Sequence, residues 1–234
     1  MASQNKAKRK VAVFDIDGTF FRSSLLIEIV EALIRGKIFP ERARRIYRRE
    51  YENWQDRKGG YDKYITAVVG AFFKNIRGVR RSDFIRVARR TVSEHKNRVY
   101  RFTRDLIADL KKKGYYLLAI SLSPKYVVEE FAKENGFDKV YGYIYEIDAQ
   151  GRFTGNTLYS DLIMDKSKIL MRAVEKERLT LRGSVGVGDS EADIPFLRIV
   201  ERPVCFNPND LLYRAAKRNG WPVVVERKNV IYRL

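Results

Sequence analysis

Short apolar runs separated by amphipathic stretches dominate the pattern of hydrophobic and polar positions along the chain. The first run is closed by Asp-Gly, which is typical of a buried strand followed by a turn. Runs of this kind occupy residues 10–16, 115–121, 184–188, 203–206 and 222–225. Helical patterns fill most of the intervals between them. Strands that alternate with helices predict an α/β fold with a parallel sheet, which binds its ligands at the carboxyl ends of the strands.

A long helical pattern separates the first two predicted strands. Residues 25–34 repeat pairs of apolar side chains at the spacing of one helical face, and no strand pattern appears up to about residue 104. We therefore predict an all-helical insertion, from which the chain returns to the sheet through a helix over residues 105–113. Later in the chain, two apolar segments flank the turn sequence at residues 148–151 and predict a hairpin.

Composition and charge narrow the kind of chemistry. The chain of 234 residues is 45% hydrophobic, which suits one large globular domain or two small ones. Its 47 Lys and Arg residues exceed its 29 Asp and Glu residues by 18, so we expect an anionic partner. A single Cys, Cys205, and a single His, His95, exclude an intrachain disulfide and the usual zinc sites. Catalysis is therefore expected to use carboxylates, hydroxyls, Lys and metals that prefer oxygen ligands.

Nothing in the pattern predicts membrane insertion or export. No apolar run approaches the roughly 18 residues that span a bilayer. The basic residues 1–10 are followed by a short apolar run that meets Asp15, so no signal-peptide core is formed. We interpret residues 1–10 as a solvated arm and expect a soluble, cytoplasmic protein. The apolar neighbours of Cys205 predict a buried, unreactive thiol.

The first candidate motif is Asp15-Ile16-Asp17-Gly18-Thr19, at the end of the first predicted strand. Both carboxylates leave the strand end together, and Gly18 lets the chain turn away sharply. Because Asp is also common in ordinary turns, this motif alone is weak evidence of a functional site. Its significance depends on the motifs that follow.

The second motif, Ser121-Leu122-Ser123-Pro124, follows the next predicted strand. Ser123 has the properties of a helix N-cap and Pro124 those of a first helical residue, with Gly136 as the stop signal. The free N–H groups of that helix and the Ser121 hydroxyl would form a seat for a phosphate group. The alternative is that both serines serve only as caps.

Two acidic residues and a lysine complete the set. Asp189 and Asp193 follow the strand at 184–188, and their spacing of four would turn both carboxylates to one side of a helix that begins there. The glycines of this region do not complete a dinucleotide-binding motif, and no Walker sequence occurs. Lys166 and Lys168 form a pair that, taken alone, is typical of a solvated surface.

In this chain order, the four motifs resemble the haloacid dehalogenase superfamily, specifically its phosphoserine-phosphatase-like branch with a helical C1 cap after the first motif. The resemblance extends over nearly the whole chain. It implies a Rossmann-like parallel sheet core formed by residues 1–22 and 105–234, with an all-helical cap domain at residues 23–104. It also implies a Mg²⁺-dependent phosphatase that acts on a small phosphorylated metabolite.

The resemblance implies a role for each motif residue. Asp15 would be the nucleophile that forms an aspartyl-phosphate, and Asp17 would protonate the leaving oxygen and then activate water. Ser121 and Lys166 would hold the phosphoryl oxygens. The metal is expected at Asp15, Asp17 (through its backbone carbonyl), Asp189 and Asp193, and the substrate at Thr19, Ser24 and Leu122.

The cap and the basic surface leave the substrate open. Where phosphoserine phosphatases carry a Glu that binds the substrate amino group, this chain has Ser24, which is equally an N-cap candidate. Residues 67–71 lack the expected cap Arg, so phosphoserine is not favoured. Residues 77–104 carry ten Lys and Arg against two Asp and Glu, which predicts a salt-bridged surface or a site for nucleic acid or a phospholipid headgroup.

A phosphatase is the favoured interpretation, with two alternatives. One is a phosphotransferase or mutase that uses the same aspartyl-phosphate. The other is a basic nucleic-acid-binding protein on the same scaffold, against which the intact set of acidic residues argues.

Overall fold

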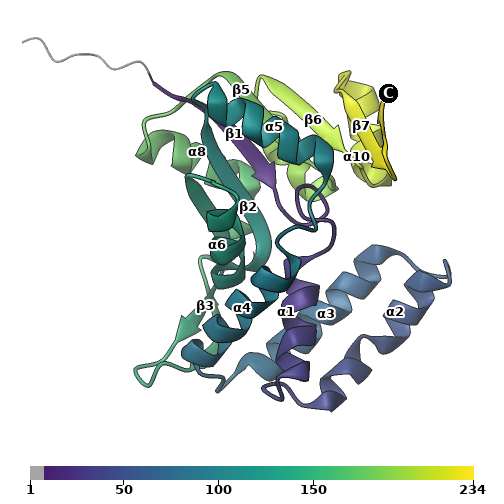
Figure 1. Cartoon of the computed structure of the whole chain (residues 1–234), viewed down its shortest axis with the longest axis vertical. Coiled ribbons are helices and arrows are strands. Elements are labelled where there is room, and N and C mark those ends of the chain that lie inside the picture. Colours follow the sequence, from purple (N-terminus) through teal and green to yellow (C-terminus); the bar gives the residue numbers. More distant parts are fainter. Residues whose placement is uncertain (1–7) are drawn as a thin grey trace, which may run out of the picture.

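The computed structural model describes residues 8–234 and is built around an eight-stranded sheet with the order β4-β3-β2-β1-β5-β6-β7-β8 (Figure 1). The strands are β1 (Lys10–Asp15), β2 (Tyr116–Pro124), β3 (Lys139–Ile147), β4 (Phe153–Leu158), β5 (Thr180–Gly188), β6 (Arg202–Phe206), β7 (Val223–Arg227) and β8 (Val230–Arg233). All neighbours pair in parallel except β4 and β8, the antiparallel strands at the two edges. The predicted α/β fold with a parallel sheet is confirmed, whereas the predicted arm at residues 1–10 lies largely outside the described residues.

Helices of very different lengths connect these strands. They are α1 (Leu25–Arg35), η1 (Glu41–Ile46), α2 (Arg48–Gln55), α3 (Tyr61–Ile76), α4 (Arg81–His95), α5 (Arg101–Lys112), α6 (Lys125–Glu134), α7 (Ser160–Ile163), α8 (Lys166–Lys176), η2 (Glu191–Asp193), α9 (Ile194–Leu197) and α10 (Asp210–Asn219). Helices alone fill the described chain between β1 and β2, as the sequence predicts.

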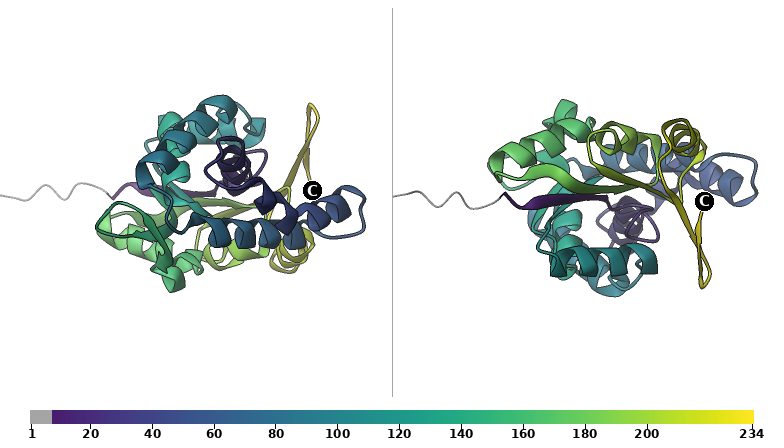
Figure 2. Two further views of the ribbon diagram at one scale, coloured as in Figure 1. Left: turned by 90° about the horizontal axis from the view of Figure 1, so that it is seen from below. Right: turned by 90° about the horizontal axis from the view of Figure 1, so that it is seen from above.

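The side chains of β1 explain why helices cover both faces of the sheet (Figure 2). Ala12 and Phe14 pack into one hydrophobic core, and Val11 and Val13 into another. Successive side chains of a strand point to opposite faces, so an unbroken apolar run needs cover on both. Apolar residues of α5 and α6 join the first core, and those of α8, α9 and α10 join the second.

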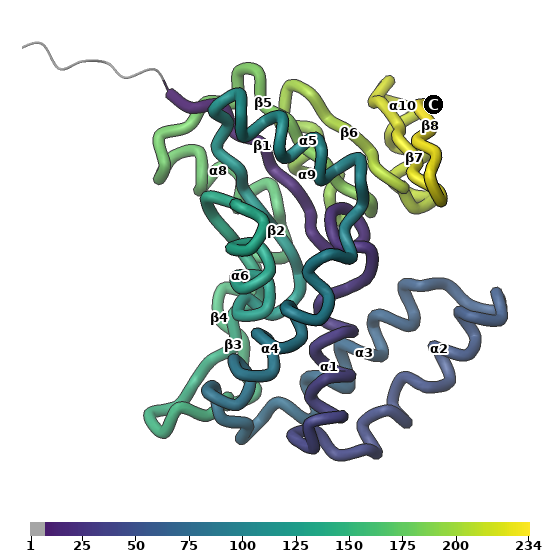
Figure 3. The backbone as a smooth tube through the Cα atoms, in the orientation of Figure 1, coloured from purple at the N-terminus to yellow at the C-terminus, as the bar shows by residue number. Residues whose placement is uncertain are grey.

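The helical segment is joined to the sheet at the end of β1. In Figure 1, α1 to α4 lie beyond the carboxyl ends of β1 and β2, and α5 runs back along the sheet. The outgoing and returning connections pair with each other through a bridge between Phe21 and Val99 (Figure 3). Backbone hydrogen bonds of 2.8 Å from Arg22 to Arg98 and 3.0 Å from Tyr100 to Phe20 flank this bridge.

Three local expectations differ from the structure. The predicted N-cap at Ser123 is wrong, because β2 continues to Pro124, and Pro124 itself precedes the first residue of α6. The helix that returns to the sheet begins at Arg101 rather than at residue 105. The edge strand β8 is absent from the prediction, since its apolar run is only Val230 to Tyr232 and its residues are mostly exposed.

Other expectations are met. β3 and β4 form the predicted hairpin, and Gly136 ends α6 with φ +73°. Cys205 is fully buried, and burial raises the pKa of its thiol to about 12, which keeps it protonated. Within residues 8–234, no helix combines the length and the apolar character needed to cross a bilayer.

Candidate active site

The register of the sheet brings the motif residues to one edge. Asp15, the last residue of β1, lies opposite Ile120 of β2, so Ser121 follows at the same level. On its other side, β1 pairs with β5 in a register that reaches Val187, two residues before Asp189. The carboxyl ends of these three parallel strands therefore present their polar side chains to a common space.

Asp15 is a buried carboxylate with one oxygen bound and one oxygen free. Its Oδ1 accepts a hydrogen bond of 2.6 Å from Lys166 Nζ. Its Oδ2 is buried and has no hydrogen-bond partner within residues 8–234. Burial raises the pKa of Asp15 to about 8, because the charged form loses its water, although the Lys166 ammonium opposes this shift.

Lys166 is held in place by the start of α8. Asp165, the N-cap residue, accepts backbone N–H bonds from Ser167 at 3.0 Å and from Lys168 at 3.4 Å. The Lys166 ammonium is buried and also donates to Asp193 Oδ1 at 2.5 Å. Burial alone would lower the pKa of Lys166, but the neighbouring carboxylates outweigh it and raise the pKa, so the ammonium stays charged. Lys168, by contrast, has a mostly exposed side chain.

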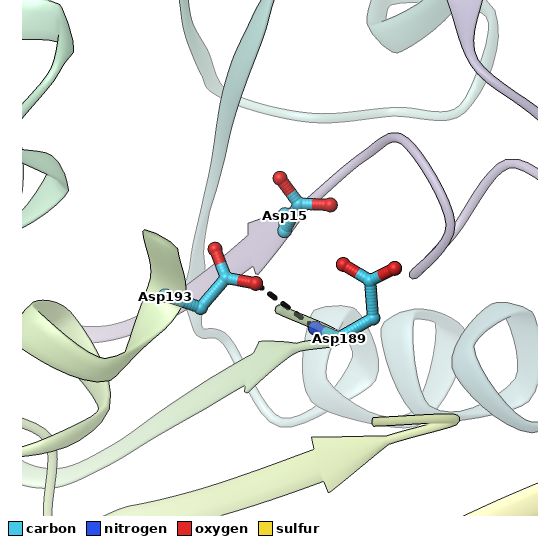
Figure 4. A group of neighbouring side chains, drawn as sticks. All are labelled: Asp15, Asp189 and Asp193. Atoms are coloured by element: carbon cyan, nitrogen blue, oxygen red, sulfur yellow. Dashed lines mark hydrogen bonds between the residues drawn. The ribbon is translucent and has the colours of Figure 1, made fainter. Parts of the chain in front are cut away.

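Asp189 and Asp193 face Asp15 across the end of β5 (Figure 4). They do not lie on one helical face as predicted: Asp193 ends the short 3-10 helix η2, and its Oδ2 accepts the N–H groups of Asp189 at 2.9 Å and Ser190 at 3.0 Å. Burial, followed by the charges of Asp15 and Asp193, raises the pKa of Asp189 well above its ordinary value. The turn therefore directs the Asp189 carboxylate toward Asp15. Both oxygens of Asp193 accept hydrogen bonds.

This cluster fits a hard divalent cation. One oxygen each from Asp15, Asp189 and Asp193 lie within 4.8 Å of one another. Carboxylate oxygens are the ligands that Mg²⁺ prefers, and Asp15 Oδ2 is an unsatisfied buried oxygen that a cation would satisfy. A cation would also offset the excess of carboxylates over the single Lys166 ammonium.

Asp17 turns its carboxylate toward helix α1 rather than into this cluster. Its Oδ1 accepts the backbone N–H of Leu25, the first residue of α1, at 2.5 Å. Its Oδ2 accepts hydroxyl hydrogen bonds from Ser121 at 2.5 Å and Ser123 at 3.0 Å. Burial raises the pKa of Asp17, and these three hydrogen bonds oppose the rise. The Asp17 side chain is not part of the metal-like cluster, so its expected metal contact is limited to its backbone carbonyl.

The residues expected at the substrate lie in the loops around these carboxylates. Thr19 is fully buried, and its hydroxyl has no hydrogen-bond partner within residues 8–234. Ser24 is buried and precedes α1 as its N-cap residue, but its side chain makes no capping hydrogen bond. Leu122 is 37% exposed between two buried serines.

Ser123 belongs to the site, although the sequence pattern predicted it only as a helix cap. The pattern Ser121-x-Ser123 repeats the spacing of Asp15-x-Asp17 on the neighbouring strand, and this repetition is the signal that could have identified it. Residues two apart on β2 point to the same side of the sheet, and both serine hydroxyls donate to Asp17 Oδ2.

Sequence comparisons agree with this arrangement of motifs. A family model described as haloacid dehalogenase-like hydrolase matches residues 12–198. The chain is 25% identical to the "Inhibition of morphological differentiation protein" of Streptomyces azureus, over 92% of this chain and 78% of that protein. It is 29% identical to the histidinol-phosphatase of Neisseria meningitidis serogroup C, over 52% of this chain and 56% of that protein.

Solved structures share the fold. A Bordetella pertussis protein of unknown function superimposes with a TM-score of 0.73 at 19% identity, covering 93% of this chain and 98% of that one. A phosphoserine phosphatase with a phospho-aspartyl intermediate analogue gives a TM-score of 0.60 at 18% identity, with 95% of each chain covered. The phosphoserine phosphatase of T. onnurineus gives 0.55 at 22% identity, covering 97% of this chain and 94% of that one.

Proposed function

The chain belongs to the haloacid dehalogenase-like hydrolases, and we propose that it is a Mg²⁺-dependent phosphomonoesterase that transfers the phosphoryl group through Asp15. One observation carries the proposal: at the end of β1, the buried Asp15 contacts Lys166 and keeps one oxygen unpartnered beside Asp189. A carboxylate attacking a phosphate dianion needs neighbouring positive charge, which Lys166 and a metal would supply.

In the first proposed step, an oxygen of Asp15 attacks phosphorus, and the bond between phosphorus and the substrate oxygen breaks. Asp17 gives its proton to the leaving oxygen, so the products are an alcohol and an aspartyl-phosphate. Burial raises the pKa of both carboxyl groups. A cation at Asp15 would lower its pKa and favour the charged nucleophile, whereas the Asp17 side chain lies outside the cluster and would keep its proton before the step.

In the second proposed step, Asp17 takes a proton from water. The water oxygen attacks phosphorus, the bond to Asp15 breaks, and inorganic phosphate leaves. Ser121 lies beside Asp17 and would hold a phosphoryl oxygen together with Lys166. Lys166 would keep its charge throughout, since two carboxylates surround its ammonium.

The proposed metal ligands are the side chains of Asp15 and Asp189 with the backbone carbonyl of Asp17. Asp193 would orient this set, which its hydrogen bonds to Lys166 and to the N–H of Asp189 support. When bound, Mg²⁺ would neutralise charge on the phosphoryl group and the carboxylates.

The proposed cap is the helical segment that was predicted at residues 23–104, inserted in a core of residues 1–22 and 105–234. The continuous helix α5 supports a slightly earlier border, before Arg101, because Ile107 and Leu110 of α5 pack in the core with the sheet. Such a cap, joined at the end of β1, would enclose a substrate bound at Asp15.

A small phosphomonoester is the proposed substrate class. The likeness to a histidinol-phosphatase over half of the chain supports this class. Phosphoserine itself is not favoured, because Ser24 is buried at the start of α1 and provides no carboxylate for an amino group.

The test is a hydrolysis screen of the purified protein against p-nitrophenyl phosphate and a panel of phosphorylated metabolites. We expect activity with Mg²⁺, its loss in EDTA and its return when Mg²⁺ is restored. Lys166→Met should be inactive, and the matched change Lys168→Met should be active, because only Lys166 contacts Asp15. Full activity in EDTA, or equal activity of the two variants, would contradict the proposal.

A further inference from the structure

Five arginines line a hollow of about 1130 Å³ between the start of α4 and the turn that joins β3 to β4. We call this hollow the arginine groove. Its arginines are Arg80, Arg81, Arg86, Arg89 and Arg152. The remaining lining residues are Ser82, Ile85, Gln150 and Gly151, so no acidic side chain faces it. It shares no lining residue with the candidate active site.

Backbone hydrogen bonds fix the two walls of the groove. Arg80 pairs with Arg152 in an antiparallel bridge, and the N–H of Arg81 donates to the carbonyl of Gly151 at 2.8 Å. The Arg152 guanidinium donates to the carbonyl of Gly78 at 2.8 Å. Figure 1 shows the β3–β4 turn beside the first turn of α4. The groove is therefore preorganised rather than assembled from free loops.

Three of the five guanidinium groups have no carboxylate partner in the part of the chain that the structure describes. Arg86 pairs with Asp83 at 2.7 Å, and Arg89 pairs with Glu130 at 3.2 Å. Within residues 8–234, no carboxylate lies within ion-pair distance of the other three arginines, which are Arg80, Arg81 and Arg152. Arg81 instead donates to the Tyr126 hydroxyl.

Some basic residues outside the groove form ion pairs within a single helix. Arg48 pairs with Glu52, and Arg90 pairs with Glu94, each at 2.8 Å and one helical turn apart. Arg90 is adjacent to Arg89 in sequence but is not part of the groove. Six of the ten basic residues at 77–104 thus form ion pairs with described residues. Two of the four that do not, Arg80 and Arg81, lie in the arginine groove.

We propose that the arginine groove binds the phosphate backbone of a nucleic acid. Guanidinium forks match phosphate oxygens in pairs, and the excess of 18 positive charges on the chain would attract a polyanion. The groove is much larger than one phosphate group, and its concave shape does not suit a flat membrane.

The lining indicates which part of a nucleic acid would be contacted. Ile85 is the one large apolar side chain that lines the groove, and the aliphatic stems of the arginines supply further apolar surface. No aromatic ring lines it, so contacts would be made to the backbone and not to stacked bases. This binding is independent of the proposed phosphatase reaction.

The test is a salt titration of binding to fluorescein-labelled duplex DNA and hairpin RNA, followed by anisotropy. The groove variant is Arg80→Gln/Arg152→Gln, in which Gln keeps hydrogen-bonding capacity without charge. The control is Arg48→Gln/Arg90→Gln, which removes the same charge from paired arginines outside the groove. Hydrolysis of p-nitrophenyl phosphate by each variant separates a failure of this proposal from a failure of the proposed function.

We expect submicromolar binding at physiological salt that the groove variant weakens at least tenfold. The slope of log affinity against log salt on duplex DNA should become shallower by about 0.9 for each phosphate group that the variant no longer neutralises, whereas the control should keep the original slope. Absence of binding, equal weakening by both double variants, or tighter binding to polyglutamate or anionic vesicles than to nucleic acid would overturn the proposal.

Discussion

Ser123 donates its hydroxyl hydrogen to the Asp17 carboxylate across 3.0 Å. The Ser123 hydroxyl oxygen also accepts the backbone N–H of Leu26, in the first turn of α1, at 3.0 Å. Asp17 in turn accepts the N–H of Leu25. One buried serine therefore fixes both the proposed acid and the start of the helical segment, which links the orientation of Asp17 to the position of α1.

Ser123→Ala should change the pH dependence of turnover as well as its rate. The Ser123 hydrogen bond lowers the pKa of Asp17 against the larger effect of burial. Its removal should raise that pKa further, so the alkaline limb of the profile, where Asp17 loses its proton, should move to higher pH while kcat falls. The measurement is kcat and KM for p-nitrophenyl phosphate across pH.

Ser121→Ala is the comparison for this variant. It also removes a donor to Asp17 but leaves the acceptor of the Leu26 N–H in place. Amide exchange at Leu26 should therefore accelerate in Ser123→Ala and not in Ser121→Ala. Unchanged exchange at Leu26 in Ser123→Ala would show that the serine does not hold α1.

Asp165→Ala should weaken both the protein and its proposed active site. Asp165 caps α8, and loss of an N-cap acceptor costs about 0.5–2 kcal/mol. Because Lys166 is the next residue, the uncapped helix should hold its ammonium less firmly, and kcat should fall. Asp165→Asn retains a capping oxygen and should stay close to wild type in thermal unfolding and in kcat. Equal decreases in both variants would mean that the charge matters and the cap does not.

The sign of the pH effect at Asp165 follows from its hydrogen bonds. The hydrogen bond from the Ser167 hydroxyl lowers the pKa of Asp165 more than any other contact does. The carboxylate therefore contributes stability above its ordinary pKa and loses that contribution as the pH falls through its lowered folded value. The free energy of unfolding of Asp165→Asn should therefore fall less than that of the wild-type protein as the pH is lowered, which unfolding by urea at several pH values would measure.

Gly18→Ala should abolish turnover, because the added methyl group would displace the Asp189 carboxylate. Gly18 has φ +82°, and a Cβ there would run into the Asp189 carboxylate. Gly114 provides the control, because its φ is +77° and a Cβ there would meet open space. Gly114→Ala measures the backbone strain alone and should leave kcat intact with a modest fall in Tm. An active Gly18→Ala enzyme would show that Asp189 is not needed where the structure places it.

The sheet could be predicted from the sequence because its central strands are apolar on both faces. The run that contains Val11 to Phe14 has no other stable environment, and the same holds for the run at residues 184–188. β8 could not be predicted in this way, since an exposed edge strand depends on pairing with β7 rather than on its own pattern.

The convergence of the motif residues was predictable from the sequence, and their individual contacts were less so. Asp15 and Asp189 follow strands, and the register explains why they converge. Lys166 begins α8, so only the family order of the motifs could single it out. The direction of the Ser123 hydroxyl depends on how β2 aligns with β1 and α1, which no local pattern specifies. The N-cap prediction for Ser123 is wrong because its hydroxyl forms a tertiary hydrogen bond instead of capping a helix.

The most direct test of the proposed mechanism is to find the phosphoryl group on the protein. A single turnover of p-nitrophenyl phosphate with Mg²⁺, quenched in acid and digested with pepsin at low pH, where an acyl phosphate survives, should yield a phosphorylated peptide that contains Asp15 and Asp17. Fragmentation should place the group on Asp15 rather than on Asp17. Asp15→Asn, checked to be folded and not deamidated, should give neither the phosphopeptide nor turnover. Hydrolysis by the wild-type protein with the phosphoryl group on another residue, or undiminished hydrolysis by Asp15→Asn, would contradict the proposed mechanism.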